Sequence, residues 1–431
     1  MDFDYFCATR QTVIKMNKPS TLLSILAIAF TFASCGEDRT HEYLEMTAEN
    51  QWTYSKMKEA YLWADEIKSP ERSAFFGNTE KFYTSLLSGK DKVSYFTDSI
   101  QQGSYGIDCT IMRDPLGEDR SCFYALVTFV EPESPAAMAG IERGDWISSV
   151  GGKRVTSTST KLMQNGTATE MTTRNIDFDD EAGKYFWSDE ETHQVQSSTI
   201  MDAKALVLDT ILNVREKKTG YILCNNFNGD RFTEDFNEIA LGLAAEDVSN
   251  IILDLRYCTG GTLDNAAEAA AMFVPQSEKG NTFAKLVYND TAEKETLYPE
   301  SIVNLSDKQL YIVTGNATAG VAELFIAAID TSRGMHEVVT VGSVTSGANV
   351  LTETFASPYG FSISPAVARI FTPNGNELSA AGLKPDYPLN ELAEQEKLYD
   401  LGNPQEYILR NVTYLIVNGF LPAEQNGPSL Q

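Results

Sequence analysis

The feature that most constrains this chain is a regular alternation of apolar strand-like runs with helical segments between residues 220 and 390. The apolar runs include YILCNNF, NIILDLRY and QLYIVTG, and segments with helical spacing follow them: EDFNEIALGLAAE, LDNAAEAAAMFV and AELFIAAID. Near-continuous apolar strands that alternate with helices are typical of a substantially parallel sheet with helices on its faces. The pattern therefore predicts an α/β domain.

Different patterns precede and follow this domain. The segment NQWTYSKMKEAYLWADEI has apolar residues at helical intervals, and from about residue 103 the period shortens to the strands YGIDCTIMR and SCFYALVTFV around the turn DPLGED. Residues 164–200 are polar and contain the acidic run DFDDEAGKYFWSDEE, so we expect an irregular solvated loop or ribbon there. Near the C-terminus, PQEYILRNVTYLIVNGF predicts a helix that packs on the α/β domain.

The composition of the chain limits the classes of partner, metal and cofactor that it can bind. A chain of 431 residues is too long for one typical domain, and its 60 acidic residues against 34 basic ones argue against a nucleic-acid or anionic-membrane surface. With three His residues and no zinc-like Cys spacing, we expect neither a metal site nor a cofactor. Apart from Cys7 and Cys35, the remaining four of the six cysteines leave two alternatives open, pairing in an oxidising compartment or free buried thiols; Cys109 and Cys122 flank a predicted hairpin. The other two are Cys224 and Cys258.

The N-terminal region predicts export. From Met16, the segment MNKPSTLLSILAIAFTFASC has a Lys near its start, a short apolar core and small residues before Cys35, as secretory signals do. It is too short for a comfortable membrane span. Small residues that end in Cys resemble the bacterial lipoprotein box, which implies a lipid on Cys35 and membrane contact through that anchor alone. A lipid-anchored protein of the bacterial cell envelope is therefore expected, at the outer membrane and either periplasmic or surface-facing; a buried apolar helix is the alternative.

The segment SPAAMAGIERGDWISSVGG resembles a PDZ domain. A short helix leads into Gly140, a tight turn uses Gly144, and an alternating strand ends at a Gly-Gly hairpin. The resemblance implies a groove that binds an extended peptide as an added strand and caps its terminal carboxylate with backbone N–H groups. The expected capping loop is Tyr105, Gly106 and Ile107. PDZ domains also serve as hinged lids, which is the alternative.

Ordered motifs along the chain resemble the carboxy-terminal processing peptidases, or tail-specific proteases, in particular lipoprotein members from Bacteroidetes-type bacteria. The motifs are YLWADEI, TGYILCNNF, IILDLRYCTGG, LYIVTGNATAGVAELFIAAI, VGSVTSGAN and GLKPDYPL. The resemblance implies a multidomain α/β fold with a helical N-terminal region, a PDZ-like β domain and a ClpP/crotonase-like α/β peptidase core. The expected division is 1–35 (upstream segment plus lipoprotein signal), 36–100 (helical region), 101–165 (PDZ-like domain), 166–218 (polar insertion and connecting strands), 219–395 (tail-specific protease-like core) and 396–431 (C-terminal helix and tail).

The resemblance also locates a catalytic dyad whose side chains are missing. The family's helix-start motif reads Ser-Ala-Ser-Glu, and alignment on Glu323 puts Gly320 at the position of the nucleophilic Ser. Alignment of VGSVTSGAN puts Ala348 where the family has its Lys base and Thr352 where a supporting Gln often stands. A Ser hydroxyl needs a neutral amine to take its proton, so this dyad has no chemistry of its own. The implied oxyanion hole is backbone, from Gly260, Gly261 and the N–H of Val321.

These observations favour a proteolytically inactive envelope lipoprotein that binds polypeptide C-termini or unfolded segments, or acts as a scaffold. The alternative is an active serine-type peptidase with a displaced nucleophile such as Ser346, although no Lys lies between Lys308 and Lys384. A sugar-binding or surface-assembly role has no motif in its favour beyond the anchor. Asp254 and Arg256 are expected to form a charge pair that fixes a strand end rather than an acid and base.

Overall fold

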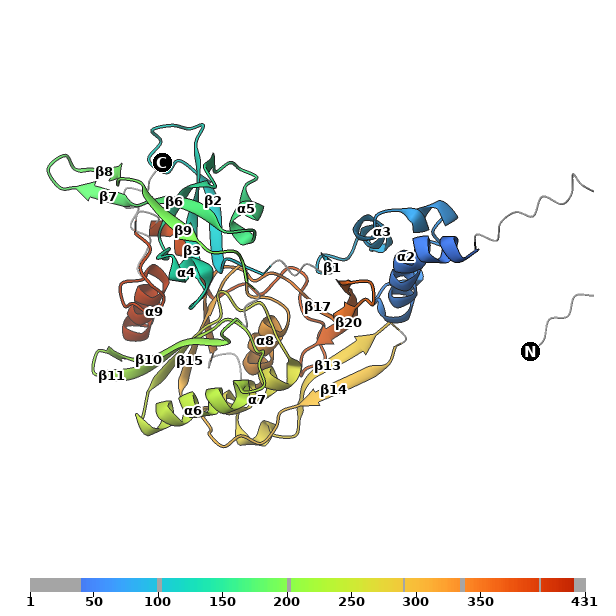
Figure 1. Cartoon of the computed structure of the whole chain (residues 1–431). Helices are drawn as coiled ribbons and strands as arrows, with labels where there is room; N and C mark the ends of the chain where they lie inside the picture. Colours follow the sequence, from blue (N-terminus) through green and yellow to red (C-terminus); the bar gives the residue numbers. More distant parts are fainter. Residues whose placement is uncertain are drawn as a thin grey trace, which may run out of the picture.

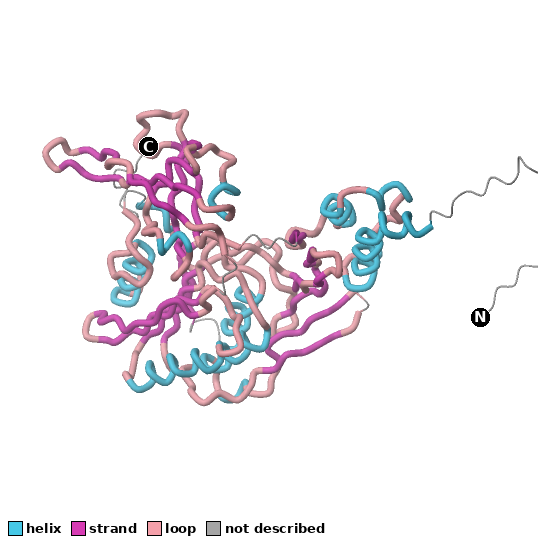
Figure 2. The backbone as a smooth tube through the Cα atoms, in the orientation of Figure 1, coloured by secondary structure: helices cyan, strands magenta, loops and turns pink. Residues whose placement is uncertain are grey.

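The computed structural model describes residues 40–98, 103–199, 203–289, 291–333, 338–394 and 397–421. The predicted signal segment and Cys35 lie outside these residues. Three bodies follow one another along the described chain: a helical region, a β domain and a large α/β core (Figure 1). Figure 2 shows the helical region set to one side of the other two. No described helix has both the length and the apolar character that a membrane crossing requires.

The predicted helical N-terminal region is confirmed. Met57, Tyr61 and Tyr83 are buried in its centre, and the backbone N–H of Leu62 donates a hydrogen bond of 2.8 Å to the Ala366 carbonyl of the core. A small antiparallel sheet extends this attachment, so the region is fastened to the core rather than tethered by a linker. Its elements are α2 (Thr40–Ala60), η1 (Ala64–Glu66), η2 (Arg72–Phe76) and α3 (Thr79–Leu86), and the sheet is β1 (Tyr95–Asp98), β19 (Phe361–Ser364) and β18 (Phe355–Ala356).

The PDZ-like domain is a sheet of strand order β2-β3-β4-β6-β9, with β5 paired to β4 and two short helices. Among the described strands, β2 stands at one end of this order. The elements are β2 (Ile107–Arg113), β3 (Phe123–Val130), α4 (Pro135–Met138), β4 (Trp146–Val150), β5 (Lys153–Arg154), α5 (Thr160–Gln164), β6 (Thr169–Arg174) and β9 (Glu191–Val195).

The expectation of an irregular segment over residues 164–200 is wrong for β6 and β9, which pair with β4 and with each other. Their inward positions alternate, but two of the inward side chains are polar. Thr173 and His193 satisfy each other through a hydrogen bond of 2.8 Å between Oγ1 and Nε2, which allows them to be buried. The predicted boundary at 165 therefore falls inside one sheet.

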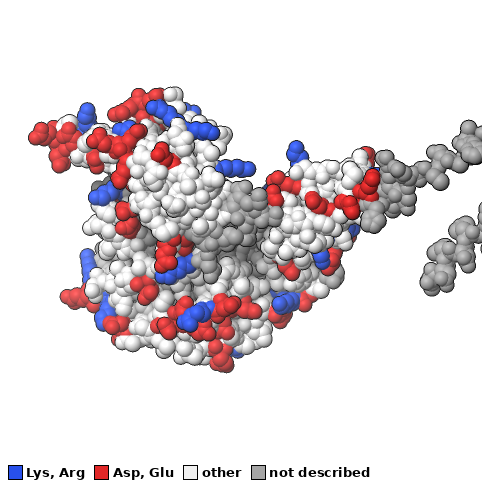
Figure 3. Space-filling view, in the orientation of Figure 1, with Lys and Arg blue, Asp and Glu red and all other residues white. Residues whose placement is uncertain are grey.

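The rest of that segment is the expected ribbon, β7 (Ile176–Asp179) and β8 (Lys184–Trp187), which projects from the domain (Figure 1). Trp187 anchors its base against Trp146. Acidic side chains gather on the projecting part, whereas both signs of charge are dispersed over the rest of the visible face (Figure 3).

The core confirms the predicted α/β domain. Its main sheet has the order β10-β11-β12-β15-β16-β21, parallel from β11 onward. Successive residues of β12 face opposite sides: Ile251 packs under α6, α7 and α8, and Ile252 packs under α9 with Leu409. The elements are β10 (Leu206–Val214), β11 (Lys217–Cys224), α6 (Phe232–Ala245), β12 (Asn250–Asp254), α7 (Leu263–Phe273), η3 (Gln276–Glu278), β15 (Gln309–Thr314), α8 (Val321–Arg333), β16 (Val338–Gly342), β21 (Tyr387–Pro388), η4 (Glu391–Glu394) and α9 (Tyr407–Asn418).

A second, antiparallel sheet of the core is not among the expected elements. Its order is β14-β13-β20-β17. Strand β17 follows directly after the loop that leaves β16. The strands are β13 (Thr282–Tyr288), β14 (Glu293–Leu297), β17 (Val350–Thr352) and β20 (Ala366–Phe371).

The four described cysteines are free thiols. In the β2–β3 hairpin, Cys109 lies opposite Val127 rather than Cys122, so the cross-strand bridge does not form. Cys224 and Cys258 are buried in the core.

Candidate active-site cleft

The strand-to-helix elbow expected after QLYIVTG is present. Strand β15 ends at Thr314, a turn follows, and α8 begins at Val321. The turn is tied to the end of β12, because the hydroxyl of the buried Thr318 donates to the Leu255 carbonyl at 2.7 Å and the N–H of Ala319 donates to the Cys258 carbonyl at 3.0 Å. Gly320 closes the turn with φ of 57°, in the left-handed region that favours glycine.

A single buried carboxylate holds the elbow against the loop after β16. Glu323 is fully buried, and its carboxylate accepts hydrogen bonds from the backbone N–H groups of Gly320 (2.9 Å), Gly347 (2.7 Å) and Ala348 (2.8 Å), and from the Thr345 hydroxyl. Its place in the first turn of α8 also suits the positive end of the helix dipole. The positions matched to the nucleophile and to the base are thus fixed by one group.

Sequence reasoning used Glu323 only as an alignment anchor and missed this role. The available signal is the spacing of a capping box, in which a Glu three residues after the N-cap accepts from the N-cap backbone N–H. Gly320 and Glu323 have that spacing. The hydrogen bonds from Gly347 and Ala348 to Glu323 join residues far apart in the chain, so no local sequence pattern predicts them.

The elbow opens into a cavity of about 320 Å³, which we call the elbow cavity. It gathers every residue that the sequence places in the catalytic and oxyanion positions. No residue that lines it, within the part of the chain that the structure describes, is titratable. The lining residues are Val93, Thr259, Gly260, Gly261, Ala319, Gly320, Val321, Ser346, Ala348, Val350, Leu351, Thr352 and Ile370.

In the elbow cavity, there is room for an added side chain at Gly320 but not at Gly261. A Cβ built on Gly320 would have only the Ala348 carbonyl oxygen as a neighbour, 4.0 Å away. A Cβ on Gly261, where φ is 137°, would lie 2.6 Å from the Phe227 backbone. A Cβ on Gly260 would lie 3.6 Å from the backbone nitrogen of Val321. Gly260 therefore brings backbone close to the start of α8, as a backbone oxyanion hole requires, whereas Gly261 packs against the backbone of Phe227.

Ser346, the suggested substitute nucleophile, is exposed at the rim of this cavity. Its backbone N–H donates to the Thr318 carbonyl at 2.9 Å, which fixes its position relative to the elbow. None of the described residues lining the cavity is a Lys or a His that could take its proton.

The predicted PDZ capping loop has internal partners. The N–H of Tyr105 donates to the Gln164 carbonyl at 3.0 Å, the N–H of Gly106 donates to the Ser104 hydroxyl at 2.9 Å, and Ile107 lies in β2 opposite Val130. A peptide carboxylate has to displace the first two bonds before it can be capped there.

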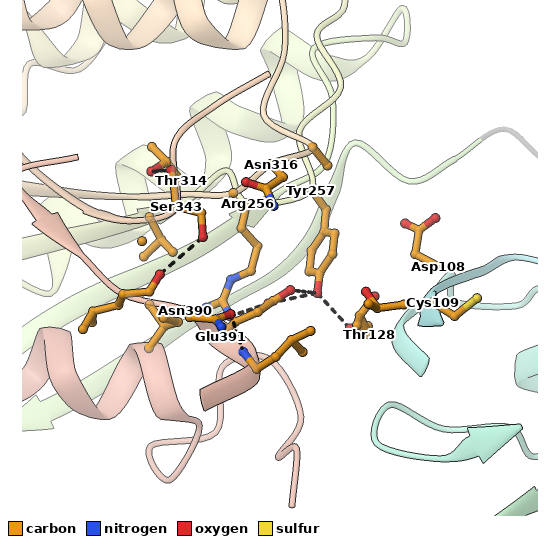
Figure 4. Close-up of a pocket in the computed structure, with 18 of the residues that line it drawn as sticks. Asp108, Cys109, Thr128, Arg256, Tyr257, Thr314, Asn316, Ser343, Asn390 and Glu391 are labelled. Atoms are coloured by element: carbon orange, nitrogen blue, oxygen red, sulfur yellow. Dashed lines mark hydrogen bonds and ion pairs between the residues drawn. The ribbon is translucent and has the colours of Figure 1, made fainter. Parts of the chain in front are cut away.

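A second cavity, also of about 320 Å³, lies between the PDZ-like domain and the core, and we call it the interdomain cavity (Figure 4). It shares Thr259 with the elbow cavity. Its walls come from β2 and β3 on one side and from the ends of β12, β15 and β16 on the other. The lining residues are Asp108, Cys109, Thr110, Thr128, Arg256, Tyr257, Thr259, Val313, Thr314, Gly315, Asn316, Ala317, Gly342, Ser343, Leu389, Asn390, Glu391, Leu392 and Ile408.

The expected Asp254–Arg256 charge pair is confirmed and belongs to a larger ion network under this cavity. Arg256 lies 2.7 Å from Asp254 and 2.8 Å from Glu406, the N-cap of α9. Burial by itself raises the pKa of Glu406, but Arg256 and the N–H of Leu409 outweigh it, so the pKa is below its usual value. The pair is thus structural, and it ties the end of β12 to the closing helix.

The PDZ-like domain joins the same network through Arg143. Its Nε donates to the Tyr399 carbonyl at 3.0 Å, its Nη1 donates to the Tyr257 hydroxyl at 2.9 Å, and its Nη2 lies 3.6 Å from Glu391. The rings of Phe129 and Tyr257 stack across the junction at 5.3 Å. Among the described residues, no group of three or more His, Cys, Asp and Glu side chains could hold a metal ion.

Three segments match known family models. Residues 48–95 match the peptidase S41 N-terminal domain, residues 126–174 a PDZ domain, and residues 218–389 peptidase family S41. The third segment contains both the elbow and the loop that follows β16.

Relatives agree with these matches. A Staphylococcus aureus protein described as a CtpA-like serine protease is 26% identical over 270 residues, which cover 62% of this chain and 50% of the relative. The chain thus spans about half the length of such curated relatives. A Bacteroides fragilis crystal structure assigned as an S41 protease is 25% identical with a TM-score of 0.73, covering 86% of this chain and 97% of that one. The photosystem II D1 C-terminal processing protease shares the fold, at 18% identity and a TM-score of 0.53 over 85% of this chain and 97% of its own.

Proposed function

The chain belongs to peptidase family S41, among the carboxy-terminal processing proteases, and from this premise we propose that its elbow cavity binds polypeptide C-termini or unfolded segments without cleaving them. The observation that supports the proposal is a cavity with close backbone approach and no titratable side chain among its described lining residues. We place the protein in the bacterial envelope, anchored through Cys35.

The chemistry of the proposal follows from what serine peptidases need. A carbonyl held by backbone N–H groups is not cleaved unless a nucleophile attacks it and a base takes the proton. At the positions matched to these groups, Gly320 has no side chain and Ala348 has only a methyl group. Loss of a nucleophile or its base typically lowers kcat by several orders of magnitude, whereas binding through backbone groups is retained.

The test is a paired assay on residues 36–431, which omit the predicted signal segment and Cys35. Cleavage of an unfolded protein with an apolar tail is measured beside calorimetric binding of the same tail. We expect binding without cleavage in the wild-type protein. In Gly320→Ser with Ala348→Lys, we expect cleavage at least about 1,000-fold above the wild-type rate, because both missing groups are returned.

The added Ser is sterically feasible, since nothing lies within 4 Å of its Cβ except the Ala348 carbonyl at the 4.0 Å limit. The left-handed backbone costs a non-glycine residue about 1–2 kcal/mol. Gly320→Ala with Ala348→Lys is the matched control, because it has the same strain and no hydroxyl. Absence of tail binding in the wild-type protein would overturn the proposal.

An active peptidase that uses Ser346 is the second candidate, favoured by the exposure of this hydroxyl at the rim of the elbow cavity. Ser346→Ala separates the two candidates. Cleavage by the wild-type protein that disappears in this variant would establish the displaced nucleophile and refute an inactive cleft.

Lipid attachment is tested separately. We expect a fatty-acid analogue fed to producing cells to label the wild-type protein and not Cys35→Ala. Equal labelling of both would refute the anchor and leave the proposal for the elbow cavity untouched.

A further inference from the structure

A network of charged side chains lies under the interdomain cavity, and its charges do not cancel. Arg143 and Arg256 face three carboxylates, those of Asp254, Glu391 and Glu406, so the network has one more negative than positive charge. The ion pairs of this network measure 2.7 to 3.8 Å, and Arg256 and Glu391 line the cavity itself.

Asp108 adds a further negative charge from the PDZ side. In the part of the chain that the structure describes, its carboxylate has neither an ion-pair nor a hydrogen-bond partner. Figure 4 shows it across the gap from Tyr257 and Asn316, with no contact to the side chains around it. Asp108 is exposed to solvent, and partial burial of its carboxylate by the surrounding residues raises its pKa. The nearby Glu131 has the backbone N–H of Lys204 as a partner at 2.8 Å.

An unpaired carboxylate beside a net negative network favours a cationic ligand. An anion would be repelled, and an apolar group would remove water from Asp108 without replacing its hydrogen bonds. An ammonium or guanidinium group supplies both charge and donors. Asn316 is exposed on the opposite wall, where its side-chain oxygen can accept a second bond.

A polypeptide bound in the neighbouring elbow cavity is the source of cation that the structure favours. The two cavities share Thr259. They also meet at one turn of the chain, where Ala317 lines the interdomain cavity and Ala319 lines the elbow cavity. A polypeptide held in the elbow cavity can therefore reach the interdomain cavity with a long side chain. We propose that the interdomain cavity binds a Lys or Arg side chain of the polypeptide held in the elbow cavity, with Asp108 as its ion-pair partner. This inference rests on the proposed function and adds a preference for basic polypeptides.

The experiment compares Lys with norleucine, which has a similar aliphatic chain and lacks the charge. Ten-residue Ala/Val peptides with a free C-terminus contain one Lys or one norleucine at each position in turn, and calorimetry measures their binding to residues 36–431. At one or two adjacent positions we expect Lys to bind about tenfold more tightly than norleucine. The advantage should shrink as salt is raised, because solvent reaches Asp108.

Asp108→Asn should abolish the Lys advantage and leave norleucine binding unchanged. Asp177→Asn is the matched control, since it removes the same charge from an exposed strand of the projecting ribbon. It should retain the advantage, which separates a local ion pair from the general attraction of a chain with a net charge of -26. In Asp108→Lys, a peptide with Glu at the same position should bind better than one with Lys.

The outcomes are distinct. Equal binding of Lys and norleucine peptides at every position would overturn this inference and leave the proposed function standing. A Lys advantage that survives in Asp108→Asn, or that disappears equally in Asp177→Asn, would overturn the role of Asp108. If no peptide binds, the proposed function fails and the inference fails with it.

Discussion

The elbow cavity and the interdomain cavity share Thr259 and have the same volume of about 320 Å³, yet their walls are chemically opposite. The described lining of the elbow cavity has no titratable group, and its shape comes from backbone that Glu323 holds. The interdomain cavity is lined by the charged side chains of Asp108, Arg256 and Glu391, which come from two domains. A cleft whose frame is backbone can lose reactive side chains without losing its shape, whereas one made by side chains cannot.

The largest expected effect is a loss of folding stability when the ion network under the interdomain cavity is broken. Arg256→Leu leaves Asp254 and Glu406 buried without their shared cation, and breaking a buried ion pair in this way costs about 3–5 kcal/mol. Urea unfolding measures the loss. Arg410→Leu is the control, because its ion pair with Glu394 is partly exposed and should contribute less than about 1 kcal/mol. Equal losses in the two variants would contradict the distinction between buried and exposed pairs.

Removal of Glu323 should have a slightly smaller effect. Glu323→Ala leaves the backbone donors of Gly320, Gly347 and Ala348 without their acceptor, and we expect the free energy of unfolding to fall by about 3 kcal/mol. Glu323→Gln keeps one acceptor oxygen and should lose less.

The same substitution tests the elbow frame functionally. Introduced into the Gly320→Ser, Ala348→Lys protein, Glu323→Ala should remove most of the restored cleavage even at temperatures where the protein is folded. Undiminished cleavage would show that the frame does not depend on this carboxylate.

Two glycines of the elbow cavity provide a matched pair. Gly261→Ala forces a Cβ to within 2.6 Å of the Phe227 backbone, while Gly320→Ala meets nothing closer than 4.0 Å, and both have positive φ. The backbone φ is 57° at Gly320 and 137° at Gly261, and the second angle is less accessible to a residue with a Cβ, so the difference in stability reports the clash together with this extra strain. We expect Gly261→Ala to be less stable than Gly320→Ala by about 2 kcal/mol in urea unfolding. Similar stabilities would mean that the loop of Gly261 yields easily.

The smallest expected effect is a pH dependence of the folding stability that Glu406 contributes through the ion network. Because the folded pKa of Glu406 is lowered, its carboxylate stabilises the fold above its unfolded pKa, and this contribution is lost as pH falls through the folded value. Between pH 7 and pH 3, Glu406→Gln should therefore lose less stability than the wild-type protein, by on the order of 1 kcal/mol. A steeper loss in the variant would reverse the sign and refute the assignment.

Local pattern alone determined much of this protein. The alternation of apolar strands and helices predicts the core, and the strand-to-helix turn at residues 315–320 predicts the elbow, because both depend on neighbours a few positions apart. The identities of Gly320 and Ala348 are also plain in the sequence. Their equivalence to a lost nucleophile and base stays a prediction, although the structure brings both to one cavity.

Contacts between distant residues were decided only by the tertiary structure. Glu323 reaches donors up to 25 positions away, and Arg143 meets Tyr257 across 114 positions, so no local spacing reveals either contact. Strands β6 and β9 escaped detection because Thr173 and His193, polar yet buried, hide the apolar alternation that identifies a strand. Periodicity records which face of an element is apolar, whereas a buried polar group is decided by the partner that satisfies it, and that partner is found only when the chain has folded.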